Sequence, residues 1–321
     1  MVVSPKVFFE HCYGDYAIAA VNVFTMEQVH GLFAAAVSAD APFIVQLTPV
    51  ARNYAHPTML SSMIAAAAKI YPKAVYAVHL DHGNEEHVFD AISSKDYQSV
   101  MIDASHDGFE TNVARTRAVV ERAHQSGIAV EAELGVLAGV EDDLDIAQEH
   151  SRYTRPSEVA AFVRATKCDS LAVAVGTSHG AYKFSGGQGI QFQILKEIQE
   201  RLNGFPIVLH GGSAVNVGEI ERINQAGGKL QEGAAGVAAE EIVESIKYGV
   251  CKINIATDTR LLWTRVHREF FKNSPALFDP ILPGKQYIQE YGKFMEEKFE
   301  LFGATGKADK IKSVNKKVFS R

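Results

Sequence analysis

In the stretch Tyr76-Ala77-Val78-His79-Leu80-Asp81-His82-Gly83, an apolar run of strand length ends abruptly in a carboxylate, an imidazole and a glycine. A near-continuous hydrophobic run is typical of a parallel strand that is buried on both faces. The residues just past the carboxyl end of such a strand are where α/β folds carry their chemistry. Asp81 and His82 hold that position and are therefore the first candidate functional residues.

Further short apolar runs alternate with amphipathic segments of helix length along the whole chain. The eight predicted strands cover residues 16–23, 43–47, 76–80, 99–102, 128–133, 170–175, 206–209 and 251–255. Eight βα units joined by right-handed crossovers close naturally into a barrel, which predicts an α/β protein with a (β/α)8 TIM-barrel fold. A doubly wound open sheet is the alternative, but no G-x-G-x-x-G follows the first strand.

The composition fits one large folded domain. The chain has 321 residues, of which 47% are apolar and 22% charged, with a formal net charge of −6, so it can bury a large core. We predict a single barrel domain over residues 1–306, which includes a mostly helical segment at 258–302. A basic tail over 307–321 follows it.

The same features bear on partners and location. The mild acidity argues against nucleic acid or a membrane surface as a partner held by bulk charge. The three cysteines are widely spaced and fit neither a disulfide framework nor a zinc finger. We find no signal-peptide h-region and no uninterrupted apolar stretch that is long enough to span a bilayer. We therefore expect a cytoplasmic protein that acts on a small molecule.

Ionisable side chains gather at the carboxyl ends of the predicted strands, which share one rim in a barrel. His82, His179 and His210 follow three different strands, and such an imidazole set predicts a catalytic divalent ion with open coordination positions. Zinc is the first choice for imidazole ligands, and cobalt or iron fit the same site. The alternative for each histidine alone is a hydrogen-bonded structural residue.

Carboxylates on the same rim are candidates for outer partners of these ligands or for a second metal position. Asp103 follows the fourth strand, and Glu133 ends the fifth. Glu131 is predicted to point the opposite way from Glu133, so a polar strand-end residue is an equal alternative for it.

A second cluster, rich in glycine and short polar side chains, follows the last three strands. The loops after strands seven and eight of such barrels recurrently bind phosphate through backbone N–H groups. The candidates are Gly180, Lys183, Gly211, Gly212, Ser213, Asn254 and Thr257. A tight turn is the alternative for the two adjacent glycines, but it does not account for Ser213 or Asn254.

The segment 135–145 combines small residues with acidic ones. Such a composition predicts a mobile loop that brings Glu141 over the site. An exposed acidic turn is the alternative.

Five motifs resemble those of class II, metal-dependent ketose-bisphosphate aldolases, over a region from about Tyr16 to Gly306. They are LDHG at 80–83, SVMIDASH at 99–106, EAELG at 131–135, GTSHGAYK at 176–183 and KIN at 252–254. The resemblance implies a TIM barrel with one catalytic Zn²⁺ per subunit, and a homodimer or homotetramer. A monovalent cation is a further candidate cofactor. The implied reaction is the reversible cleavage of a fructose- or tagatose-type ketose 1,6-bisphosphate into dihydroxyacetone phosphate and an aldehyde such as glyceraldehyde 3-phosphate.

The resemblance also implies a role for each rim residue by its position. His82, His179 and His210 resemble the zinc ligands. Asp81 resembles the acid/base that exchanges a proton with the C4 hydroxyl, and Glu141 resembles the loop glutamate that handles the proton on the enediolate carbon. The substrate and its phosphate are implied to contact Asn22, Thr48, Gly180, Lys183, Gly211, Gly212, Ser213, Asn254, Thr257 and Arg260.

The distal end of the implied site departs from the fructose-bisphosphate pattern. Ala256 stands where an acidic or amide residue is usual and resembles the tagatose-bisphosphate relatives, and Ile281 replaces an arginine that binds the distal phosphate. Thr48 replaces a serine and Phe24 an asparagine, whereas Arg260, implied to reach the neighbouring subunit's site, is retained. Loss of a bidentate cation weakens phosphate capture by on the order of a few kcal/mol. The sequence therefore leaves a different ketose 1-phosphate open as the preferred substrate.

Two other classes of function remain as alternatives. A metal-dependent barrel hydrolase would also place histidines and an aspartate at strand ends, where they activate water. The predicted phosphate cluster counts against it. A non-catalytic metal-binding relative is the second alternative, and the presence of Asp81 and Glu141 beside an open metal site counts against that.

Overall fold

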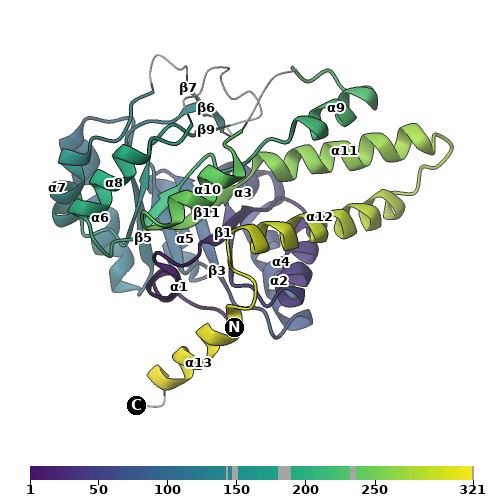
Figure 1. Ribbon diagram of the computed structural model, residues 1–321. Helices are drawn as coiled ribbons and strands as arrows, with labels where there is room; N and C mark the ends of the chain where they lie inside the picture. Colours follow the sequence, from purple (N-terminus) through teal and green to yellow (C-terminus); the bar gives the residue numbers. More distant parts are fainter. Residues whose placement is uncertain (142–143, 147–150, 180–188, 232–235, 320–321) are drawn as a thin grey trace.

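The computed structural model describes residues 1–141, 144–146, 151–179, 189–231 and 236–319. Eight parallel strands form a closed barrel in the order β1-β11-β10-β8-β5-β4-β3-β2, and helices surround it (Figure 1). The strands are β1 (Ile18–Asn22), β2 (Phe43–Leu47), β3 (Tyr76–Gly83), β4 (Ser99–Ile102), β5 (Ala129–Leu134), β8 (Ser170–Val173), β10 (Ile207–Leu209) and β11 (Val250–Ile255). The predicted TIM barrel and its eight strands are confirmed.

Burial explains why these strands read as continuous apolar runs. Every residue in them is buried except His82, which is partly buried. One face of each strand fills the barrel and the other packs against the helices, so a parallel strand of this kind has no solvent-facing side. The polar residues among them, such as Gln46, Glu131 and Lys252, therefore need partners inside the barrel.

Side-chain caps mark the starts of some of the helices that surround the barrel. Those between barrel strands are α2 (Met26–Ser38), α3 (Pro49–Ala55), α4 (Pro57–Ile70), α5 (Glu85–Ser94), α6 (Phe109–Gln125), α7 (Pro156–Thr166), α8 (Phe192–Arg201), α9 (Val217–Gln225) and α10 (Ala239–Ile246), and α1 (Pro5–Cys12) precedes them. Thr25 caps α2 through the backbone N–H of Gln28, and Asn84 caps α5 through that of His87.

Two long helices, α11 (Thr257–Asn273) and α12 (Ile281–Leu301), project from the barrel as an antiparallel hairpin (Figure 1). α12 packs back along α2, and a Cβ on Gly31 of α2 would lie 2.8 Å from Cδ1 of Tyr291. The glycine therefore permits the close approach of the two helices. The predicted helical character of residues 258–302 is confirmed, with a break at the tip of the hairpin.

A small sheet that was not predicted from the sequence lies on the same side of the barrel as the carboxyl ends of the barrel strands. It consists of β6 (Ala138–Glu141), β7 (Leu144–Ile146) and β9 (Ser178–His179), in the order β7-β6-β9. β6 pairs with β9 in parallel, and Gly139 faces His179. The segment predicted as a mobile loop thus contains two strands, one of which carries Glu141 beside the strand of His179.

The chain continues after α12 into a last helix, α13 (Ala308–Phe319). Ala308 and Ile311 at its start are buried in the main core. The basic tail is therefore helical from Ala308 to Phe319 and is anchored at its beginning, while the division at 306/307 stays a prediction. None of the helices in the described ranges has the length and apolar character to cross a bilayer.

Candidate active site and metal centre

β3 ends in an irregularity that redirects two consecutive side chains. Its pairing with β4 shifts register between Leu80 and Gly83, and His82 has a φ of 47°, in the left-handed region. Consecutive residues of a regular strand point to opposite faces, and an extra residue in one strand changes that direction. Asp81 is consequently fully buried, and His82 reaches Asp103 at the end of β4.

Two imidazoles meet at this rim of the barrel. His82 Nδ1 lies 2.9 Å from Oδ2 of Asp103, and His210 Nε2, just after β10, lies 2.9 Å from Oε1 of Glu131. A carboxylate accepts a hydrogen bond, so these two nitrogens are the ones that carry a proton. The other two nitrogens, His82 Nε2 and His210 Nδ1, are 3.0 Å apart and present lone pairs to each other when both rings are neutral.

This arrangement fits a bound metal ion. Two lone pairs repel at this distance, and a shared cation removes the repulsion. Asp81, His82 and His210 bring ligand atoms within 4.8 Å of one another, and His82, Asp103 and Glu133 form a second such group. A carboxylate that holds the other ring nitrogen is the usual companion of a metal-bound histidine. The donor set therefore suits zinc, cobalt or iron.

Burial and neighbouring charges fix the protonation states that this arrangement needs. Burial raises the pKa of Asp103, but hydrogen bonds from His82 and Ser105, together with the nearby charges of His82 and His106, outweigh it and hold that pKa well below its usual range. Burial likewise raises the pKa of Glu131, but Lys252 and His210 together hold it far below its usual range. Burial lowers the pKa of His210. Ionised carboxylates thus face a histidine that favours its neutral, metal-binding form.

Lys252 of β11 compensates the charge of Glu131 inside the barrel. Its Nζ lies 2.9 Å from Oε2 of Glu131, and the two side chains are 1% and 2% exposed. The prediction that Glu131 points the opposite way from Glu133 is wrong. Residues two apart on a strand share a face, and both glutamates are buried, with Glu131 bonded to His210.

Three amides hold the carboxylate of Asp81. Its Oδ2 accepts hydrogen bonds from Asn22 Nδ2 at 2.9 Å and from Gln46 Nε2 at 3.2 Å, and its Oδ1 accepts one from Asn254 Nδ2 at 3.3 Å. Gln46 also donates to Oδ1 of Asn22 at 2.9 Å. The carboxylate is therefore fixed in one orientation beside the two imidazoles, as a general acid or base requires. The sequence reasoning missed Gln46, although an amide inside an apolar strand is a signal.

Gly211, directly after His210, packs against the strand that carries His179, and Gly212 packs against β11. Gly211 has a φ of 63°, and a Cβ there would lie 2.5 Å from the carbonyl oxygen of Ser178. A Cβ on Gly212 would lie 2.6 Å from Cγ2 of Ile253. Only glycine allows this contact, which brings the backbone of β9 next to His210.

Comparison with known proteins identifies the family. Residues 4–307 match the family described as fructose-bisphosphate aldolase class-II. The chain belongs to this family. The fructose-bisphosphate aldolases of Giardia intestinalis and Thermus caldophilus are each 40% identical to it, over 94% and 91% of this chain and 92% and 95% of theirs. The crystal structure of the YdjI aldolase from Escherichia coli K12 has a TM-score of 0.77 at 27% identity and covers 96% of this chain and 100% of its own.

Membership makes the chain a class II aldolase, which is a carbon–carbon lyase of carbohydrate metabolism that depends on a metal and acts on phosphorylated sugars. The barrel hydrolase and the non-catalytic relative lose their support. The metal dependence agrees with the facing imidazoles of His82 and His210.

The structure of this aldolase places most of the predicted site residues. Those that contact one another at the rim are Asn22, Asp81, His82, Asp103, Glu133, His210 and Asn254, and Gly211, Gly212 and Ser213 follow directly. The side chains of Glu141 and His179, together with all of Gly180 and Lys183, lie outside the described part of the chain.

Two of the remaining predicted substrate contacts, Thr48 and Arg260, already have partners within the chain. The Thr48 hydroxyl accepts a hydrogen bond from the backbone N–H of Ala51 and caps α3, and Thr257 is the first residue of α11. The Arg260 guanidinium carbon lies 4.9 Å from the centre of the Phe24 ring. Their roles toward a substrate stay predictions.

We expect Lys252→Met to lower the free energy of unfolding by about 3–5 kcal/mol, because methionine fills the space but leaves Glu131 as an uncompensated charge inside the barrel. Urea unfolding followed by circular dichroism measures the loss. Lys6→Met is the matched control, since its side chain is 54% exposed and pairs with Asp169 at the surface, where such a pair contributes less than about 1 kcal/mol. Equal losses in the two variants would contradict the account.

Proposed function

We propose that this aldolase reversibly cleaves a ketose 1,6-bisphosphate, with fructose 1,6-bisphosphate as the first substrate, into dihydroxyacetone phosphate and glyceraldehyde 3-phosphate. The observation that carries the proposal is the buried carboxylate of Asp81, held by three amides beside two imidazoles whose lone pairs face each other. Relatives that are 40% identical over most of the chain and are named fructose-bisphosphate aldolases support the choice of substrate.

The proposed metal ligands are His82 and His210, with His179 as the third by position. The contact of Gly211 with Ser178 supports His179, because it brings that segment beside His210. Bound there, a divalent ion such as Zn²⁺ polarises the carbonyl of the substrate. We propose one such ion per subunit and a monovalent cation as a further ligand, with Asp103 and Glu133 as outer partners or a second position.

The proposed proton carriers are Asp81 and Glu141. Asp81 takes the proton of the C4 hydroxyl as the C3–C4 bond breaks and returns it in the condensation direction. The amides of Asn22, Gln46 and Asn254 keep its carboxylate in one orientation during this exchange. Glu141, by position, exchanges a proton with the carbon of dihydroxyacetone phosphate that was bonded to the aldehyde.

The proposed phosphate site lies on the segments after β10 and β11. Backbone N–H groups and short side chains at those strand ends are the usual phosphate donors of a TIM barrel. The proposed contacts are Gly211, Gly212, Ser213, Asn254 and Thr257, with Gly180 and Lys183 added by position. Thr48 and Arg260 are the proposed contacts for the rest of the substrate.

A second candidate substrate is tagatose 1,6-bisphosphate or a ketose 1-phosphate with a different distal end. Ala256 favours it, because this residue precedes α11 and offers only a methyl group beside the proposed phosphate site. Ile281, at the outer end of the α11–α12 hairpin, has no charge for a distal phosphate and is 58% exposed.

We expect Asp81→Asn to lower the cleavage rate by about 10²–10⁴-fold, because the amide keeps the shape of the side chain but takes up no proton. Release of triose phosphate from fructose and tagatose 1,6-bisphosphate, with the zinc-loaded protein, measures the effect. The parent protein should lose activity after chelation, and the exposed Asp96→Asn should keep it. An Asp81→Asn variant as active as the parent would contradict the assignment, and a parent that prefers tagatose bisphosphate would favour the second candidate.

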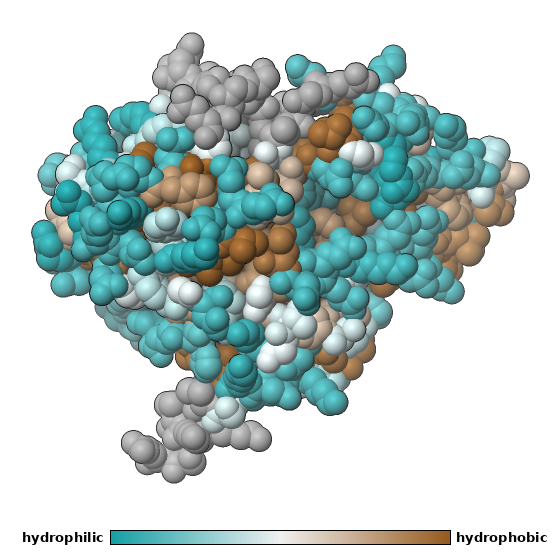
Figure 2. Space-filling view, viewed as in Figure 1, coloured by the Kyte–Doolittle hydropathy of each residue, from teal (hydrophilic) through white to brown (hydrophobic). Residues whose placement is uncertain are grey.

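We further propose that the enzyme is a homodimer or homotetramer in the cytoplasm. Large apolar side chains are exposed toward the outer end of the α11–α12 hairpin, where apolar atoms show at the right of Figure 2; they are Phe271, Leu277, Phe278, Ile281 and Leu282, and Trp263 is exposed nearer the barrel on α11. Apolar groups gathered in this way mark interaction surfaces. The three free, buried cysteines support a reducing compartment.

We expect the parent protein to sediment as a dimer or larger species. Phe278 is 92% exposed, and Phe278→Asp should shift the equilibrium toward the monomer because it introduces a charge into the apolar surface. Analytical ultracentrifugation measures both, with Lys285→Asp on the exposed side of α12 as the control. A parent protein that is monomeric at all concentrations would contradict the proposal.

A further inference from the structure

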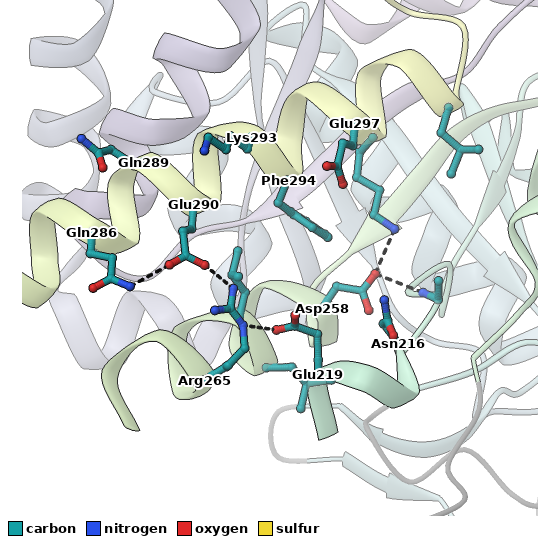
Figure 3. Close-up of a pocket in the computed structure, with 15 residues that line it drawn as sticks. Asn216, Glu219, Asp258, Arg265, Gln286, Gln289, Glu290, Lys293, Phe294 and Glu297 are labelled. Atoms are coloured by element: carbon teal, nitrogen blue, oxygen red, sulfur yellow. Dashed lines mark hydrogen bonds and ion pairs between the residues drawn. The ribbon is translucent and has the colours of Figure 1, made fainter. Parts of the chain in front are cut away.

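A cavity of about 770 Å³ lies behind the loop that follows β10, between α9, α11 and α12 (Figure 3). Charged side chains line the cavity at both of its ends. Toward the outer end, Arg265 pairs with Glu219 and Glu290, and at the inner end Asp258 faces the loop. Asp258 directly follows Thr257, so the cavity wall is continuous with the proposed phosphate site.

Asp258 joins the two segments on which the proposed phosphate site lies. Its carboxylate accepts hydrogen bonds from the backbone N–H of Ala214 at 3.1 Å and of Val215 at 2.9 Å. Its own backbone N–H donates to the hydroxyl oxygen of Ser213 at 3.4 Å. The segment after β10 is thereby tied at three points to the start of α11.

The loop needs this tie because its backbone is strained. Val215 has a φ of 44°, and a β-branched residue in the left-handed region is rare and unfavourable. Its side chain is buried against Ile220, Ile223 and Leu261, which fixes the far end of the loop. The hydrogen bonds to the carboxylate of Asp258 thus stabilise the unfavourable left-handed backbone conformation at Val215.

A carboxylate at this place also has a disadvantage, because its negative charge opposes that of a phosphate. Lys298 of α12 offsets the charge: its Nζ lies 3.2 Å from Oδ2 of Asp258, and the two side chains are 11% and 7% exposed. The same ammonium lies 5.1 Å from the centre of the Phe294 ring. Charges that are shielded from water in this way interact strongly.

We propose that Asp258 and Lys298 are positioning residues for the substrate phosphate. Asp258 sets the conformation of the loop that carries Gly211 to Ser213, and Lys298 cancels its charge so that an anion is accepted there. The inference rests on the proposed phosphate site. Because Lys298 comes from the C-terminal part of the chain, it gives the α11–α12 hairpin a role in substrate binding.

The test compares variants of the full-length, zinc-loaded enzyme for binding of inorganic phosphate, measured by isothermal titration calorimetry. Lys298→Met leaves the carboxylate uncompensated and should raise the dissociation constant of phosphate roughly tenfold. The KM for the bisphosphate should rise by a similar factor, with kcat changed less than about twofold. Lys298→Arg keeps the charge and should restore binding.

Lys293→Met is the matched control, because this exposed lysine lies on the same helix and lines the same cavity. Its phosphate binding should equal that of the parent. If Lys298→Met does not fold, Lys298→Gln replaces it, since glutamine still donates a hydrogen bond to Asp258, and the same loss is expected.

The outcomes separate the inference from the function on which it rests. Equal phosphate binding by the Lys298 and Lys293 variants would overturn the positioning role alone. A Lys298→Met variant with reduced kcat and unchanged phosphate affinity would overturn it as well. A parent enzyme that cleaves its substrate but binds no phosphate would overturn the proposed phosphate site itself, and the inference with it.

Discussion

The hydrogen bond between Glu131 and His210, deep in the barrel, is the interaction on which the site depends. It fixes which nitrogen of His210 carries the proton and so turns the other toward His82. A carboxylate in such a place is unfavourable without compensation, and Lys252 supplies it. Glu131 and Lys252 are therefore present in otherwise apolar strands because they orient His210 at the rim of the barrel.

Local strain is concentrated at the same rim. His82 adopts a left-handed conformation at the end of β3, and Val215 does so in the loop after β10. Strained backbone persists where surrounding contacts determine it, and such places are commonly functional. Here Asp103 holds the first residue, and Asp258 holds the second. The conformation of His82 positions its imidazole at the proposed metal site, and that of Val215 shapes the loop that carries the proposed phosphate site.

The barrel itself was predictable from the sequence, because burial on both faces leaves a direct mark in apolar runs such as Phe43–Leu47. The rim residues were predictable as well, since they follow those runs. The partners inside the barrel were not. Lys252 and Glu131 are 121 positions apart, and nothing local pairs them. The strands β6 and β9 were missed because each is short and acquires its partner only through the fold.

Anomalous X-ray diffraction at the zinc edge, from crystals grown with zinc, would locate a metal ion at this rim. If Asp103 and Glu131 prepare the facing nitrogens of His82 and His210 for a metal, a strong anomalous peak is expected beside His82 Nε2 and His210 Nδ1. A peak confined to Asp103 and Glu133, or none near the two imidazoles, would contradict this role of the two carboxylates.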